Sequence, residues 1–161
     1  MSDTAPLDDP AELTRHIESR YHARHRAELP RLAELAERVE TVHFGDEDAP
    51  EGLSEVLRRM IGAMEVHMKK EELILFPAIR KGDMPGIENP IAVMRADHDD
   101  HDREIAEIRR LTANLTLPTG ACRSWAALYE GLAEFLADLE EHIRLENEVL
   151  FPRFEAAARH G

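Results

Sequence analysis

The chain has 161 residues, of which 43% are hydrophobic and 33% charged, and its formal net charge is −13. This composition is typical of a globular domain. The negative charge argues against nucleic acid and anionic membranes as partners, because their phosphates would be repelled. No apolar run approaches the roughly 20 residues of a membrane-spanning helix, and the first residues lack the pattern of a signal peptide. We therefore expect one domain over residues 1–161, located in the cytoplasm.

The first predicted helix begins at Asp9-Pro10, because aspartate is a good N-cap and proline fits the first helical position. Its apolar stripe runs from Leu13 to Val39, and the acidic stretch 45–52 ends it. Pro30 lies inside this pattern and is expected to kink or restart the helix.

Three further helices follow from the same 3.6-residue period of apolar side chains. The second runs from about residue 50 to 81, and the third starts with Asn89 as N-cap before Pro90 and ends before the break at 116–120. The fourth runs from about Cys122 to the mid-150s. Short connections favour antiparallel neighbours. The sequence thus predicts an all-α, up-down-up-down four-helix bundle.

An internal repeat divides the chain into two helical hairpins, residues 10–82 and 87–158. The stretches 67–77 and 142–152 both read H-x-x-x-E-x-x-x-L-F-P and are offset by 75 residues. The first and third helices each carry an H-x-x-H pattern, at 22–25 and 98–101, offset by 76 residues. Each hairpin therefore holds the same set of potential metal donors, and pairing the hairpins would create a pseudo-two-fold site.

These donors are predicted to lie at one level of the bundle. His22, Glu71, His98 and His142 are each 18 to 23 residues from the nearer connection at one end of the bundle. At about 1.5 Å per residue they all lie roughly 30 Å from that end. Surface histidines placed at random would not be level, so we expect a shared metal centre.

The donor types favour iron. Four histidines and two glutamates give nitrogen and oxygen donors without sulfur, which suits iron, with manganese or zinc as substitutes. One carboxylate can bind a cation through each oxygen. We therefore expect two non-haem irons bridged by Glu71 and Glu146 and by an oxo or hydroxo group. Each iron would keep one open position for a diatomic gas.

Spacing leaves the roles of three histidines open. His25 and His101 lie nearer the centres of their apolar stripes than His22 and His98, so either set fits as ligands, with the other as buried partners. His43 is 21 residues from His22, about 31 Å along a helix, and is expected to cap the end of the first helix.

Two further features are expected to support the site. The Phe-Pro pairs at 76–77 and 151–152 are predicted to end the ligand-bearing helices and to shield the metals from water. Asp97, Asp99 and Asp102 form a solvated face, from which one carboxylate would orient a ligand histidine through its second ring nitrogen.

These residues resemble the hemerythrin-like superfamily and, more closely, the di-iron repair-of-iron-centres (RIC) family. The resemblance covers residues 21–154 and rests on the stretches RYHARHRAELP, HMKKEELILFP, ADHDDH and HIRLENEVLFP. It favours His22 and His98 over His25 and His101. The iron ligands that it implies are His22, His67, Glu71, His98, His142 and Glu146.

The resemblance implies a protein of the nitrosative and oxidative stress response. Such a protein binds or reduces nitric oxide, or supplies iron for the repair of iron–sulfur centres, with an iron–sulfur protein or a redox partner. Whether it is an enzyme stays open. The alternatives are a reversible oxygen binder or sensor, as in the hemerythrins, and a metal-free helical interaction module. Full-length RIC members resemble a fusion with a cysteine-bearing N-terminal domain, whereas only about 20 residues, without cysteine, precede the first motif here.

Overall fold

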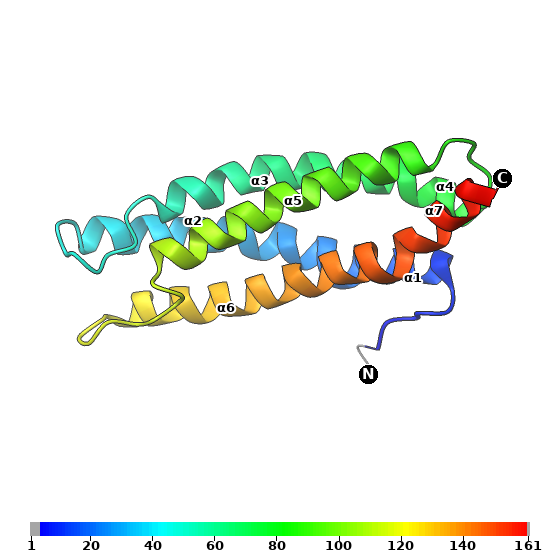
Figure 1. The fold of residues 1–161 in the computed structure, drawn as a ribbon. Coiled ribbons are helices and arrows are strands. Elements are labelled where there is room, and N and C mark those ends of the chain that lie inside the picture. The colour runs from blue at the N-terminus through cyan, green and yellow to red at the C-terminus, as the bar shows by residue number, and fades with distance from the viewer. Residues whose placement is uncertain (1–3, 161) are drawn as a thin grey trace.

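The computed structural model describes residues 4–160, with side chains up to residue 155. Residues 1–3 and 161 of the predicted domain lie outside the described part. Within residues 4–160 the secondary structure is helical, without strands. The helical segments join end to end into four long rods, which lie side by side (Figure 1). The predicted all-α four-helix bundle is therefore confirmed.

The first rod joins three segments without a break. They are α1 (Pro10–His16), the π-helical turn η1 (Ile17–His22) and α2 (Ala23–Val42). Asp9 caps the start as predicted, because its side chain accepts a hydrogen bond from the backbone N–H of Glu12 at 3.3 Å. The predicted restart at Pro30 is wrong, since α2 continues through this residue. Pro30 is exposed, so water can reach this face and replace the missing hydrogen bond.

The second and fourth rods have matching construction. The second consists of α3 (Leu53–Lys70), η2 (Glu71–Leu75) and α4 (Phe76–Lys81), and the fourth of α6 (Arg123–Arg144), η3 (Leu145–Leu150) and α7 (Phe151–His160). The third rod is a single helix, α5 (Glu88–Leu111). The predicted N-cap at Asn89 is wrong, because α5 begins at Glu88, two residues before the predicted first helical residue Pro90, with Ile87 at the cap.

The chain direction alternates from rod to rod. The connections 43–52 and 112–122 lie at one end of the bundle, and the connection 82–87 lies at the other end with α1 and α7 (Figure 1). α2 packs against α3 and α6, and α3 packs against α5. This is the predicted up-down-up-down arrangement. Of the helices described, none combines the length and apolar composition that a membrane crossing requires.

The two Phe-Pro pairs do not end their helices, contrary to the prediction. Each pair follows a π-helical turn in which the phenylalanine N–H bonds the carbonyl five residues back, from Phe76 to Glu71 and from Phe151 to Glu146. The proline then occupies the first turn of the next α-helix, as it does in α4. A proline is tolerated there because its missing N–H is not needed.

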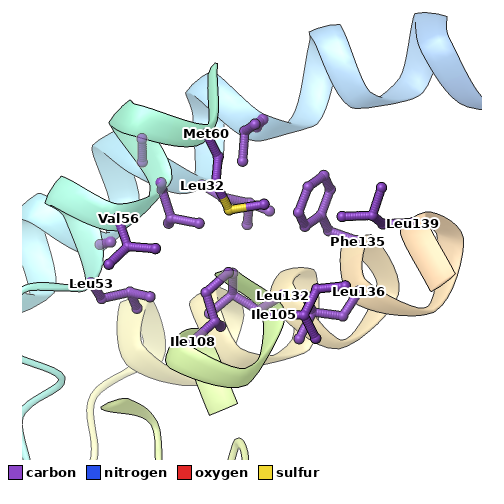
Figure 2. Packing of buried hydrophobic residues seen from close by; sticks show 14 of the residues in the cluster. Leu32, Leu53, Val56, Met60, Ile105, Ile108, Leu132, Phe135, Leu136 and Leu139 are labelled. Atoms are coloured by element: carbon purple, nitrogen blue, oxygen red, sulfur yellow. The ribbon is translucent and has the colours of Figure 1, made fainter. Parts of the chain in front are cut away.

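The apolar core forms two clusters along the bundle. The larger one lies toward the connections 43–52 and 112–122, where Figure 2 shows Leu32 and Met60 of α2 and α3 facing Ile105 of α5 and Phe135 of α6. The smaller cluster lies toward the other end and includes Leu13, Phe76 and Phe151. Between them lies a layer of buried histidines and glutamates.

Candidate metal centre

Six polar side chains meet in this layer, and none is more than 3% exposed. All four rods contribute one histidine, and the two glutamates lie at the start of the π-helical turns, Glu71 as the first residue of η2 and Glu146 as the second residue of η3. The residues are His22, His67, Glu71, His98, His142 and Glu146. These are the six predicted ligands, which the structure brings together at one level of the bundle.

The six residues form two overlapping groups. One contains His22 and His142 with both glutamates, and the other contains His67 and His98 with both glutamates. Within each group the donor atoms lie within 4.8 Å of one another, a spacing that allows one cation to contact all four. Each group takes donors from both hairpins, so neither hairpin holds a complete site.

Each carboxylate turns one oxygen toward each group. Oε1 of Glu71 lies 3.0 Å from Nε2 of His22, and Oε2 of Glu71 lies 3.5 Å from Nε2 of His67. Oε2 of Glu146 lies 2.7 Å from Nε2 of His142, and Oε1 of Glu146 lies 2.8 Å from Nε2 of His98. This arrangement allows both carboxylates to serve two cations.

The group that contains His67 and His98 has buried polar atoms without hydrogen-bond partners, which shows whether its residues fit a metal. Nε2 of His67 and His98, Oε2 of Glu71 and Oε1 of Glu146 are buried and have no hydrogen-bond partner among the described residues. An unpaired buried polar atom costs about 1–3 kcal/mol. His98 and Glu146 are close but lack hydrogen-bond geometry, as expected for two donors that point at a common third atom. The donor set therefore fits a cation with nitrogen and oxygen ligands.

The second ring nitrogen of each candidate ligand is held from outside. Nδ1 of His22 donates to Glu72 at 2.7 Å, and Nδ1 of His67 donates to Asp97 at 3.0 Å. The other two contacts join Nδ1 of His98 to Oδ1 of Asn147 at 2.7 Å, and Nδ1 of His142 to Nε2 of His25 at 3.1 Å. Such contacts fix the ring orientation and leave Nε2 free for a metal.

Only some of the residues that contact Nδ1 of the candidate ligand histidines were predicted. Asp97 is the expected aspartate that orients a ligand histidine, whereas Asp99 and Asp102 are exposed. Glu72 and Asn147 were not predicted to hold a ligand histidine. The internal repeat could have identified them, because each directly follows a candidate bridging glutamate and the two positions are equivalent in the two hairpins.

Arg26 holds Glu72 in place. Its guanidinium donates to Glu72 through Nη1 and Nη2, at 2.7 and 2.9 Å, and to Glu65 through Nε at 2.8 Å. The Glu72 carboxylate is thereby fixed against His22 and kept ionised, since these contacts outweigh burial and lower its pKa.

The two phenylalanines of the repeat cover the site symmetrically. The ring of Phe76 stacks on His22, with centroids 5.8 Å apart and an interplanar angle of 12°. Phe151 stacks on His98 in the same way, at 5.9 Å and 7°. Both phenylalanines are fully buried, which agrees with the predicted shielding of the site from water.

Burial sets the protonation states of the metal-free cluster. Together with the neighbouring His142 imidazole, it lowers the pKa of His22 to about 4. Burial likewise lowers the pKa of His142. The pKa of Glu71 is raised well above its usual range by burial and by the adjacent Glu146 carboxylate. At neutral pH His22 and His142 are therefore uncharged, which is the state that binds metals.

The three histidines left open by the sequence lie outside both donor groups. His25 contacts His142, and His101 contacts Glu104 at 3.1 Å. His43 caps α2, as predicted. Its Nε2 lies 3.2 Å from Sγ of Cys122, and its ring packs on Trp125. The His43 contact lowers the pKa of the Cys122 thiol, a consequence that the sequence analysis missed.

A four-helix bundle with a buried layer of histidines and glutamates defines a class of cation-binding helical proteins. Residues 14–154 match the model of the family described as Hemerythrin HHE cation binding domain, and the chain belongs to this family.

Similar curated proteins carry a more specific description. The chain is 48% identical over 149 residues to the iron-sulfur cluster repair protein YtfE of Edwardsiella ictaluri, covering 92% of this chain and 66% of that protein. It is 46% identical over 143 residues to a probable iron-sulfur cluster repair protein of Haemophilus influenzae, covering 89% of this chain and 64% of that protein. The predicted resemblance to the RIC family is confirmed. The chain spans slightly less than two thirds of the length of these relatives.

Proposed function

We propose that this chain is the di-iron module of an iron–sulfur cluster repair system. In this proposal His22 and His142 bind one iron, His67 and His98 bind the other, and Glu71 and Glu146 bridge them. The observation that carries the proposal is that two buried donor groups share both carboxylates, with a separate oxygen turned toward each group.

The donor count supports a reactive centre. Each iron would receive two histidine nitrogens, two carboxylate oxygens and one oxo or hydroxo bridge. An octahedral iron then keeps one position for a small ligand. The site is histidine-rich, unlike ferritin-like bundles, which pair Glu-x-x-His motifs with lone glutamates.

When bound, the iron pair would supply one-electron redox chemistry and a binding position for a diatomic gas. The protein residues exclude water, hold each ring through its Nδ1 and keep the imidazoles of His22 and His142 neutral. We propose that this environment serves nitric oxide binding or reduction, or iron release to damaged clusters. The names of the relatives support an iron–sulfur protein as the partner. The cytoplasmic location stays a prediction.

The first experiment measures iron in protein purified at low oxygen and records Mössbauer spectra of the oxidised form. Two antiferromagnetically coupled irons per chain are expected. Iron content near zero would contradict the proposal and favour the metal-free interaction module.

The second experiment adds nitric oxide to the reduced protein and, separately, mixes the loaded protein with an iron–sulfur enzyme that has lost iron. Consumption of the gas or recovery of the enzyme is expected, and the two assays separate the two branches. If neither occurs, the repair function is wrong. A stable, reversible oxygen adduct would favour the alternative function.

A further inference from the structure

His101 lies beside the second donor group but does not belong to it. Its ring is 3% exposed, and its centroid lies 5.2 Å from that of His67 and 6.4 Å from that of His98. The donor atoms of that group lie within 4.8 Å of one another, and His101 is not a member. Its Nε2 is buried without a hydrogen-bond partner among the side chains that the structure describes.

The internal repeat supplies a comparison within the same chain. His25 occupies the position equivalent to His101, and its Nε2 contacts Nδ1 of His142 at 3.1 Å. In the other half, Asp97 holds Nδ1 of His67 at 3.0 Å and takes over this role. His101 is therefore not needed to orient a ligand histidine, yet it is fully buried next to one.

Glu104 determines which ring nitrogen of His101 carries the proton. Its Oε1 lies 3.1 Å from Nδ1 of His101, one turn along α5. An ionised carboxylate only accepts hydrogen bonds, so Nδ1 is the donor, and in the neutral imidazole Nε2 is then an acceptor. The two nitrogens point out of the ring in well-separated directions, and Nε2 is the buried one. The acceptor thus points away from the partly exposed Glu104, into the buried layer.

We propose that Glu104 and His101 present a hydrogen-bond acceptor to a protonated small ligand, in the first instance water, at the second cation position. An unpaired buried acceptor is costly, and a ligand that carries a hydrogen would satisfy it. A ligand without hydrogen, such as azide, would not. Glu104 acts as a positioning residue. The inference rests on the proposed function, because the ligand would be held jointly by His101 and a metal.

The tautomer is tested in the metal-free protein by long-range proton–nitrogen NMR. We expect the Nδ1–H form of His101 in the wild type and in the control D102N. Asp102 is exposed and lies on the same helix, so D102N makes the same charge change away from the ring. In E104Q the amide can also donate, so the Nε2–H form should appear. An Nε2–H wild type, or an E104Q variant with an unchanged tautomer, would overturn the proposal.

Ligand preference is tested by titrating azide into the oxidised, iron-loaded protein. H101L should retain both irons and bind azide about five- to ten-fold more tightly, because the displaced water loses about one hydrogen bond. E104Q should bind azide more tightly as well, and D102N should resemble the wild type. Loss of one iron in H101L would make His101 a ligand and sink the idea, as would unchanged azide affinity in both H101L and E104Q. If the wild type binds no iron, the proposed function fails, whereas the NMR result still decides the role of Glu104.

Discussion

Glu72 accepts a hydrogen bond from Nδ1 of His22 at 2.7 Å, while Arg26 binds the same carboxylate from the other side. The contact links a buried candidate ligand to a partly exposed ion pair on the bundle surface. A substitution of Glu72 can therefore alter the metal centre while all six candidate ligands stay unchanged.

E72A is expected to weaken iron binding by about 10–100-fold, the range typical for groups that hold a ligand histidine. E65A is the matched control, because Glu65 also binds Arg26 but does not contact His22. Competition with a chelator measures both affinities. Equal losses in the two variants would mean that Arg26, rather than the carboxylate on His22, controls the site.

Removing one histidine from either donor group should remove one of the two irons. H22L and H98L are the appropriate pair, because they occupy equivalent positions in the repeat and belong to different groups. E71L should impair both positions, since Glu71 belongs to both groups. Iron analysis with Mössbauer spectra distinguishes these outcomes. Full iron content in E71L would argue against a bridging role.

The metal-free protein should lose stability as the pH falls from 6.5 to 4. His22 has a folded pKa of about 4, against an unfolded value near 6.5, so the unfolded chain binds more protons in this window. The contribution from His22 alone is about 3 kcal/mol, present above pH 6.5 and lost by pH 4. Urea unfolding at a series of pH values measures it. H22L should show a shallower slope, and an unchanged slope would contradict the prediction.

The Glu71 carboxyl group should make the metal-free protein less stable as the pH rises, which is the opposite of the effect of His22. Because its pKa is raised in the folded metal-free protein, the folded state keeps a proton that the unfolded chain releases above about pH 4.5. Stability therefore falls as the pH rises toward the folded pKa of Glu71. E71L should remove this decline and be more stable than the wild type at neutral pH without metal, since burying a carboxylate is costly. A less stable E71L would show that the carboxyl group supports the apo fold.

The Cys122 thiol should react faster with iodoacetamide at pH 7.5 than an ordinary exposed thiol. The His43 contact lowers its pKa, which raises the fraction of thiolate, the reactive form. H43Q should slow the reaction. H16Q is the control, because His16 lies in α1 at the other end of the first rod. Cys122 is the N-cap of α6, and equal rates in wild type and H43Q would mean that the backbone N–H groups at the start of this helix lower the pKa of the thiol without His43.

Two helical glycines should respond oppositely to alanine. A Cβ at Gly131 would lie 2.7 Å from Cδ2 of the fully buried Leu32, so G131A should destabilise the α2–α6 contact by about 1–3 kcal/mol. Gly62 has open space around it, and G62A should stabilise α3 by up to about 1 kcal/mol through helix propensity. Thermal unfolding of the two variants measures the contrast. A neutral G131A would show that Leu32 can move aside.

The sequence by itself determined the number and order of the helices and the level of the candidate ligands. Helical period and connection length are local properties, and the repeat places His22, Glu71, His98 and His142 at equal distances along their rods. The N-cap at Asp9 could also be predicted, because capping involves only residues within one helical turn.

Only the tertiary structure decided which ring nitrogens converge. His22 and His25 are both buried on one rod, and the packing of this rod against its neighbours places Nε2 of His22 against Glu71 and Nε2 of His25 against His142. The π-helical turns could not be predicted from the sequence either. Such a turn holds one extra residue and rotates every later side chain about the helix axis, but it has no distinctive residue pattern. They explain why Phe76-Pro77 continues a helix that proline alone would have ended. The physical reason is that orientation within a bundle depends on contacts between helices distant in sequence, whereas position along a helix depends on residue count alone.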